Sequence, residues 1–136
     1  MAYEKGIDSL LRPTSIAVIG ASEVKGKIGN VIVSNLKEYG FKGKIYPVNK
    51  KADQIGQIEG LKVYGSVKDI PDQVDLAIIS VPAEFVADTM RECGEKGVKA
   101  VDVIASGFGE AGNETGEQEL VAVAKQYGMT FLGPNT

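Results

Sequence analysis

Residues 15–30 constrain the fold of this chain more than any other segment. The apolar run 16–19 follows Ser15 and ends at Gly20, a pattern typical of a short strand buried on both faces of a parallel sheet. Two further glycines follow, and the next stretch predicts a helix over 27–39. A strand, a glycine-rich loop and a helix in this order favour a phosphate group, because the amides and the dipole at a helix N-terminus attract anions.

The glycine spacing departs from the Gly-x-Gly-x-x-Gly pattern of NAD-binding loops. That pattern needs a glycine at position 22, where this chain has Ser22. NAD-binding domains also place an acidic residue about 20 positions further on to hold the ribose. Here the strand expected at 44–48 runs into Asn49, Lys50 and Lys51. Two lysines suit a ribose that carries a phosphate, as in NADP or coenzyme A (CoA).

Positive charge is concentrated in one part of an otherwise acidic chain. The formal net charge is −3, yet residues 25–51 contain seven lysines and one acidic residue, Glu38. A local positive field in an acidic protein favours a small anionic ligand, since nucleic acid usually requires a broad basic face. We therefore expect no nucleic-acid partner, and no membrane partner either, because the apolar runs are too short to span a bilayer.

The length of 136 residues suits one domain with one core. Residues 1–14 predict a short helix and a lead-in, with Ile7, Leu10 and Leu11 as the packing face, and residues 15–136 form the domain. The single cysteine, Cys93, excludes an internal disulfide and a multi-cysteine metal site. We expect a cytoplasmic protein without a metal.

Strand-like and helix-like segments alternate along the chain, which predicts an α/β domain of three layers with a Rossmann-like, doubly wound parallel sheet. Strands are expected at 15–20, 44–48, 75–81, 99–104 and 129–133, helices at 27–39, 83–96 and 116–127, and a weaker short strand at 61–64. The expected order of about five strands is 3-2-1-4-5, with the binding crevice above the carboxyl ends of strands one and four. The loops after the strands should line that crevice, at 20–22, 48–51, 80–83, 105–109 and 133–135.

Taken in order, five short motifs resemble the N-terminal CoA-binding domain of the ADP-forming acyl-CoA synthetases. They are Ile-Ala-Val-Ile-Gly-Ala-Ser at 16–22 with Gly-Lys-Ile-Gly at 26–29, Tyr-Pro-Val-Asn at 46–49, Ser-Val-Pro-Ala at 80–83, Ser-Gly-Phe at 106–108, and Leu-Gly-Pro-Asn at 132–135. The resemblance extends from about residue 9 to residue 136. It is strongest to the ADP-forming acetate–CoA ligases, and the α subunits of succinyl-CoA synthetase belong to the same superfamily.

The resemblance implies a role for each matched segment in binding CoA. The loop that holds the diphosphate corresponds to Gly20, Ala21, Ser22, Gly26, Lys27, Ile28 and Gly29. The segment near the adenosine corresponds to Val48, Asn49, Lys50 and Lys51, in which Lys50 replaces the family's proline and leaves open which lysine meets the 3′-phosphate. The pantetheine path corresponds to Val81, Pro82 and Ala83, and the thiol end to Ser106, Gly107, Phe108 and Asn135.

The chain lacks one group that the family requires for catalysis. Those enzymes relay phosphate through a histidine, and this sequence contains no histidine. We therefore expect that the chain is not catalytic alone and is a fragment of a longer polypeptide. The resemblance implies as partners a second α/β domain that carries the histidine and an ATP-grasp domain.

Two other functions remain open from the sequence. One is a freestanding CoA-binding protein, which would bind CoA through the same residues. The other is an NAD- or NADP-binding Rossmann module, which the missing glycine at position 22 and the absent ribose-binding acid disfavour.

Overall fold

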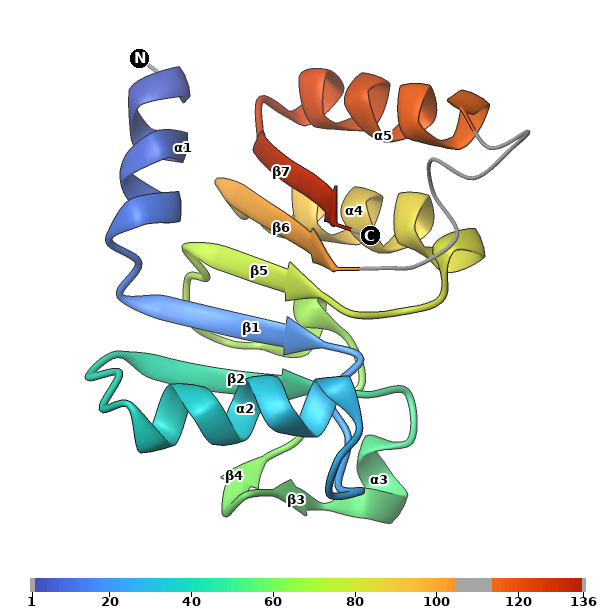
Figure 1. Ribbon diagram of the computed structural model, residues 1–136. Helices are drawn as coiled ribbons and strands as arrows, with labels where there is room; N and C mark the ends of the chain where they lie inside the picture. The colour runs from blue at the N-terminus through green and yellow to red at the C-terminus, as the bar shows by residue number, and fades with distance from the viewer. Residues whose placement is uncertain (1, 105–113, 136) are drawn as a thin grey trace.

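The computed structural model describes residues 2–104 and 114–135, and Figure 1 shows them as a central sheet with helices on both sides. The sheet contains five strands: β1 (Ser15–Ile19), β2 (Lys44–Val48), β5 (Leu76–Ile79), β6 (Ala100–Ile104) and β7 (Thr130–Asn135). The longer helices are α1 (Ala2–Leu11), α2 (Ile28–Glu38), α4 (Ala83–Lys96) and α5 (Glu114–Tyr127). Shorter elements lie between β2 and β5: α3 (Ala52–Ile55), β3 (Gln57–Ile58), β4 (Leu61–Lys62) and the 3-10 turn η1 (Val67–Asp69).

The five strands are parallel and lie in the order β2-β1-β5-β6-β7. The expected doubly wound, Rossmann-like sheet is confirmed, and the strand numbers differ only through the segment 61–64. If that segment is counted as strand three, the prediction 3-2-1-4-5 places the same strands side by side, and the strand at 129–133 becomes a sixth. Without that segment, the five strands of the sheet lie in the order 2-1-3-4-5 along the chain numbering. The segment pairs mainly with β3 and reaches the sheet through one bridge, from Tyr64 to Val48.

The register brings the carboxyl ends of three strands to one level. Ile19 at the end of β1 is opposite Val48 of β2 on one side and opposite Ile79 of β5 on the other. The strand order changes direction between β1 and β5, and in open α/β sheets the ligand site lies outside the carboxyl ends at such a point. The fold therefore places this point between β1 and β5, which are strands one and four of the prediction when 61–64 is counted as strand three.

Two hydrophobic clusters hold the helices against opposite faces of the sheet. Ala17 and Ile19 of β1 pack with α4 and α5, whereas Ile16 and Val18 pack with α2 and with Leu10 of α1. All five residues of β1 are buried, which confirms the prediction from the apolar run. Cys93 of α4 is fully buried, and burial raises the pKa of its thiol to about 12.

The prediction that Leu11 belongs to the packing face of the N-terminal helix is wrong. Leu11 is 69% exposed, while Ile7 is half-buried and Leu10 packs against the core. Helix α1 comes nearest to the sheet at Gly6, where a Cβ would overlap the Thr130 side chain at the start of β7. Within the described residues, no helix combines the length and apolar character needed to cross a membrane.

Candidate functional site

The loop after β1 begins with backbone amides that are already bonded. The N–H groups of Gly20 and Ala21 both donate to the carbonyl oxygen of Val48, at 3.0 and 3.1 Å. Gly20 has a φ of +90°, and a Cβ there would collide with the carbonyl of Ser80 after β5. These first residues therefore join the ends of β1, β2 and β5, and the amides that remain for an anion lie further along the loop.

The N-terminus of α2 is held directly against the end of β1. A Cβ on Gly29 would overlap the carbonyl oxygen of Gly20 and lie 3.0 Å from the Cα of Ala21, so only glycine fits this approach. Lys27 occupies the N-cap position without a side-chain cap, and the first turn of α2 contains no acidic residue. The positive end of this helix dipole is thus left without a compensating carboxylate on the helix itself.

A long-range contact restrains the same loop. Asn30, only 3% exposed, donates from Nδ2 to the carbonyl oxygen of Ser22 at 3.0 Å and to Oε2 of Glu59 at 3.2 Å. The same carboxylate oxygen lies 2.6 Å from the amine of Lys25. Glu59 adopts a φ of +50° in the turn between β3 and β4, and Lys37 of α2 donates to its carbonyl oxygen. We call the three side chains Glu59, Lys25 and Asn30 the Glu59 latch.

We expect Glu59→Ala to loosen the loop over residues 20–27, because Lys25 and Asn30 lose their shared acceptor. Amide hydrogen exchange should become faster in that loop and stay unchanged in the central strands. The matched control is Glu95→Ala, which removes a carboxylate that pairs with Lys68 at 3.0 Å on another surface. Equal exchange in the loop of wild type and Glu59→Ala would contradict a role for the latch.

The latch should also respond to acid. The hydrogen bond from Lys25, followed by that from Asn30, holds the pKa of the Glu59 carboxyl below its usual value. A carboxyl with a lowered folded-state pKa stabilises the protein above its unfolded-state pKa, and that stabilisation is lost as the pH falls through the folded-state pKa. The protection of the loop amides, taken relative to their intrinsic exchange rate at each pH, should therefore fall on acidification, and this step should be absent in Glu59→Gln.

Asn49 shapes the second loop of the crevice. Its Nδ2 donates to the carbonyl oxygen of Ala21 at 2.8 Å, and its Oδ1 accepts from the backbone N–H of Lys51 at 2.8 Å. The first bond joins the end of β2 to the loop between β1 and α2, which we call the glycine loop, and the second forms an Asx-turn that leads into α3. Asn49 thus sets where the side chains of Lys50 and Lys51 begin.

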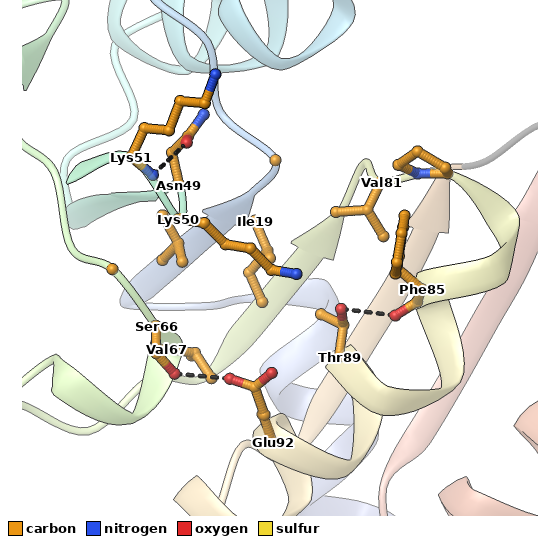
Figure 2. A pocket seen from close by; sticks show the side chains of 14 residues that line it. Ile19, Asn49, Lys50, Lys51, Ser66, Val67, Val81, Phe85, Thr89 and Glu92 are labelled. Carbon is orange, nitrogen blue, oxygen red and sulfur yellow. Dashed lines mark hydrogen bonds between the residues drawn. The ribbon is translucent and has the colours of Figure 1, made fainter. Parts of the chain in front are cut away.

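A cavity of about 280 Å³ opens at the carboxyl ends of β1 and β2 and extends along the first turns of α4. Figure 2 shows side chains from these elements facing one another across it. Apolar groups form much of its wall, and lysines, hydroxyls and one carboxylate complete it. The lining residues are Ile19, Gly20, Val48, Asn49, Lys50, Lys51, Gly65, Ser66, Val67, Val81, Pro82, Phe85, Thr89 and Glu92.

The two lysines of the cavity point in different directions. Lys50 extends across the cavity, and its amine lies 5.1 Å from the centre of the Phe85 ring, a cation–π arrangement. Lys51 points away from Phe85 (Figure 2). The lysine pair therefore presents one charge over the cavity and the other at its opposite rim.

The α4 wall begins at Pro82 and continues along one stripe of the helix. Phe85, Thr89 and Glu92 follow at helical spacing, and Thr89 Oγ1 donates to the Phe85 carbonyl oxygen at 2.8 Å. Glu92 Oε1 accepts a hydrogen bond of 2.7 Å from Ser66 Oγ. This bond joins α4 to the turn before η1 at one end of the cavity (Figure 2).

The structure brings seven of the predicted site residues into this cavity: Gly20, Val48, Asn49, Lys50, Lys51, Val81 and Pro82. Seven others do not line it and lie in the glycine loop, the start of α2 or the start of α4: Ala21, Ser22, Gly26, Lys27, Ile28, Gly29 and Ala83. Asn135 lies in β7, at the other edge of the sheet, and Ser106, Gly107 and Phe108 lie outside the described residues.

The sequence interpretation missed half of the cavity wall. Phe85, Thr89 and Glu92 could have been found from the sequence. Phe85 follows Val81 by four residues, and Thr89 and Glu92 follow after four and three more, so all three lie on one side of α4. Ser66 and its neighbours gave no local signal, because long-range contacts bring them to the cavity: the bridge between Tyr64 and Val48 and the hydrogen bond from Ser66 to Glu92.

These features define a Rossmann-like domain for an anionic nucleotide. They are a parallel sheet, a glycine loop, a helix N-terminus without a side-chain cap, and a cavity with two lysines at the point where the strand order reverses. The comparison with known proteins narrows this class. The chain belongs to the CoA binding domain family, whose model matches residues 14–136.

Similar proteins include much longer CoA ligases. The chain is 56% identical over 133 residues to the α subunit of ADP-forming acetate–CoA ligase I of Pyrococcus furiosus, covering 95% of this chain and 29% of that one. It is 41% identical over 128 residues to the ADP-forming 4-hydroxybutyrate–CoA ligase of Nitrosopumilus maritimus, covering 93% and 18%. The apo structure of acetyl-coenzyme A synthetase 1 of Candidatus Korarchaeum cryptofilum matches with a TM-score of 0.89 and 52% identity, covering 95% and 28%.

The chain therefore spans less than a third of the length of these relatives. It is homologous to the N-terminal part of the ADP-forming acetyl-CoA synthetases, which confirms the resemblance seen in the sequence motifs.

Proposed function

We propose that this chain binds CoA and holds it for acyl transfer within a larger NDP-forming acyl-CoA synthetase. The observation that carries the proposal is the cavity beside the glycine loop, because it combines apolar walls with two lysines at the carboxyl ends of β1 and β2. The family match over residues 14–136 supports CoA as the nucleotide. The proposal includes a cytoplasmic location and a division into a lead-in, 1–14, and the domain, 15–136.

The parts of CoA would occupy different parts of the crevice. The diphosphate would lie at the loop from Ser22 to Gly29, where the N-terminus of α2 lacks a side-chain cap. The adenosine would enter the cavity between Val48 and Val81, and the 3′-phosphate would meet a lysine at its rim. The pantetheine would run past Pro82 and Ala83 toward Ser106, Gly107, Phe108 and Asn135.

The role of the chain in the reaction would be to hold and orient CoA. In acyl transfer from an acyl phosphate, the CoA sulfur bonds to the acyl carbon and phosphate leaves. The acyl phosphate would be made elsewhere in the assembly, by the domain that carries the histidine and by an ATP-grasp domain. This chain would supply neither the phosphate relay nor the acyl pocket, and the relatives, which are ligases for different acids, support an acyl pocket outside this domain.

Isothermal titration of the chain with CoA, dephospho-CoA, NADP and NAD tests the proposal. We expect CoA to bind, dephospho-CoA to bind more weakly because it lacks the 3′-phosphate, and NAD to show no heat of binding. Binding of NAD or NADP without CoA would replace the proposal with a dehydrogenase-like module. Absence of binding to all four ligands would contradict CoA binding by this chain.

A further inference from the structure

One end of the cavity carries a fixed carboxylate, which is unexpected in a site for an anionic ligand. Ser66 Oγ accepts a hydrogen bond from the backbone N–H of Lys68 at 3.2 Å and donates its own proton to Glu92 Oε1 at 2.7 Å, because a carboxylate can only accept. Within the described residues, Glu92 Oε2 accepts no hydrogen bond and Glu92 forms no ion pair. Figure 2 shows that this second oxygen does not point at Ser66. A hydrogen-bond acceptor is thus held in place at the cavity wall.

The polarity of the cavity gives the orientation of its ligand. A carboxylate repels phosphate and accepts hydrogen bonds only, so it favours a cation or a hydrogen-bond donor beside it. CoA carries no cation at neutral pH, so the part of CoA beside Glu92 would be a neutral donor. The wall of the same cavity also contains the apolar side chains of Ile19, Val48, Val67 and Val81, which suit a flat ring. The 6-amino group of adenine is a donor on the edge of such a ring.

We propose that Glu92 reads the 6-amino group of the adenine and so selects adenine over a 6-oxo purine. This inference rests on the proposed binding of CoA. The Ser66 hydroxyl acts as a positioning group that holds the carboxylate in its orientation. A 6-oxo purine would bring a carbonyl oxygen against the carboxylate in place of the amino group, leaving two acceptors facing each other, and its N1–H donor lies one ring position away. A site built around a hydrogen bond to the 6-position disfavours a ligand that lacks the donor there.

The test compares the affinities of CoA and of CoA with its adenine deaminated to hypoxanthine. We expect wild type to prefer CoA by at least about tenfold. In Glu92→Gln this ratio should fall to within about twofold of one, because an amide both accepts from an amino group and donates to a carbonyl. The matched control is Glu95→Gln on the same helix, where the carboxylate pairs with Lys68 at 3.0 Å and does not line the cavity; it should keep the wild-type ratio.

Each result has a definite meaning. If Glu92→Gln weakens both ligands equally, as contact with ribose or pantetheine would require, Glu92 does not read the base and the inference fails while CoA binding stands. If wild type itself does not distinguish the two ligands, the inference fails in the same way. If wild type binds neither, the proposed function fails, and the inference fails with it. The ratio of CoA to dephospho-CoA should be unchanged in Glu92→Gln, since the 3′-phosphate lies at the other end of the site.

Discussion

Gly29→Val should destabilise the fold by about 3 kcal/mol, a large part of the stability of a small domain. The side chain would be driven into the carbonyl of Gly20 and against the Cα of Ala21, and neither backbone group can move without separating the ends of β1, β2 and β5. The resemblance seen in the sequence implies that Gly29 belongs to the loop that holds the diphosphate. In the structure it leaves room for the protein's own backbone.

Urea denaturation of wild type and variant measures this effect. Gly65→Ala is the control, because a Cβ at Gly65 would meet the Asp69 side chain only at 3.5 Å, an ordinary contact. Its free energy of unfolding should lie within about 1 kcal/mol of the wild-type value. A Gly29→Val protein of wild-type stability would show that α2 can move away from β1 at no cost.

Lys51→Ala should weaken CoA binding by about 1–3 kcal/mol and leave dephospho-CoA nearly unaffected, the size expected for one charge-assisted hydrogen bond. Lys51 is chosen over Lys50 because the Lys50 amine already lies over the Phe85 ring, whereas Lys51 points away from it. A 3′-phosphate at the rim would therefore find Lys51 free to turn toward it.

Titration of both variants with both ligands separates the two lysines. Lys50→Ala should lower the affinity for CoA and dephospho-CoA alike, since Lys50 extends over the cavity and not toward one phosphate. If Lys50→Ala instead loses CoA selectively while Lys51→Ala does not, the assignment is reversed. Equal losses for both ligands in both variants would place the 3′-phosphate elsewhere.

The regular elements of the fold were predictable because their signals are local. The apolar run of β1 marks a doubly buried strand, and α4 is bounded by Pro82 at its start and by Gly97 in a left-handed conformation at its end. The elements α3, β3 and β4 were not predicted as they occur, because two to four residues are too few to show a period.

The candidate site was only partly predictable because it depends on distant contacts. Glu59 meets Lys25 across 34 positions of sequence, and Ser66 meets Glu92 across 26. Thr89 and Glu92 also lie beside the buried face of α4, formed by Val86, Met90 and Cys93, where polar residues look like an ordinary solvent-facing surface. Only the packing of α4 beside η1 shows that they face a cavity.

The burial of Cys93 has a consequence for the redox chemistry of a CoA complex. The thiolate is the nucleophile in disulfide exchange, and a thiol whose pKa is raised to about 12 inside the core is almost wholly protonated at neutral pH. The only cysteine of this chain would therefore form no mixed disulfide with oxidised CoA while the domain stays folded. In a mixture of the folded domain with reduced CoA, a thiol-reactive dye would therefore report the sulfur of CoA alone, and the accessibility of that sulfur could be followed without replacing any residue.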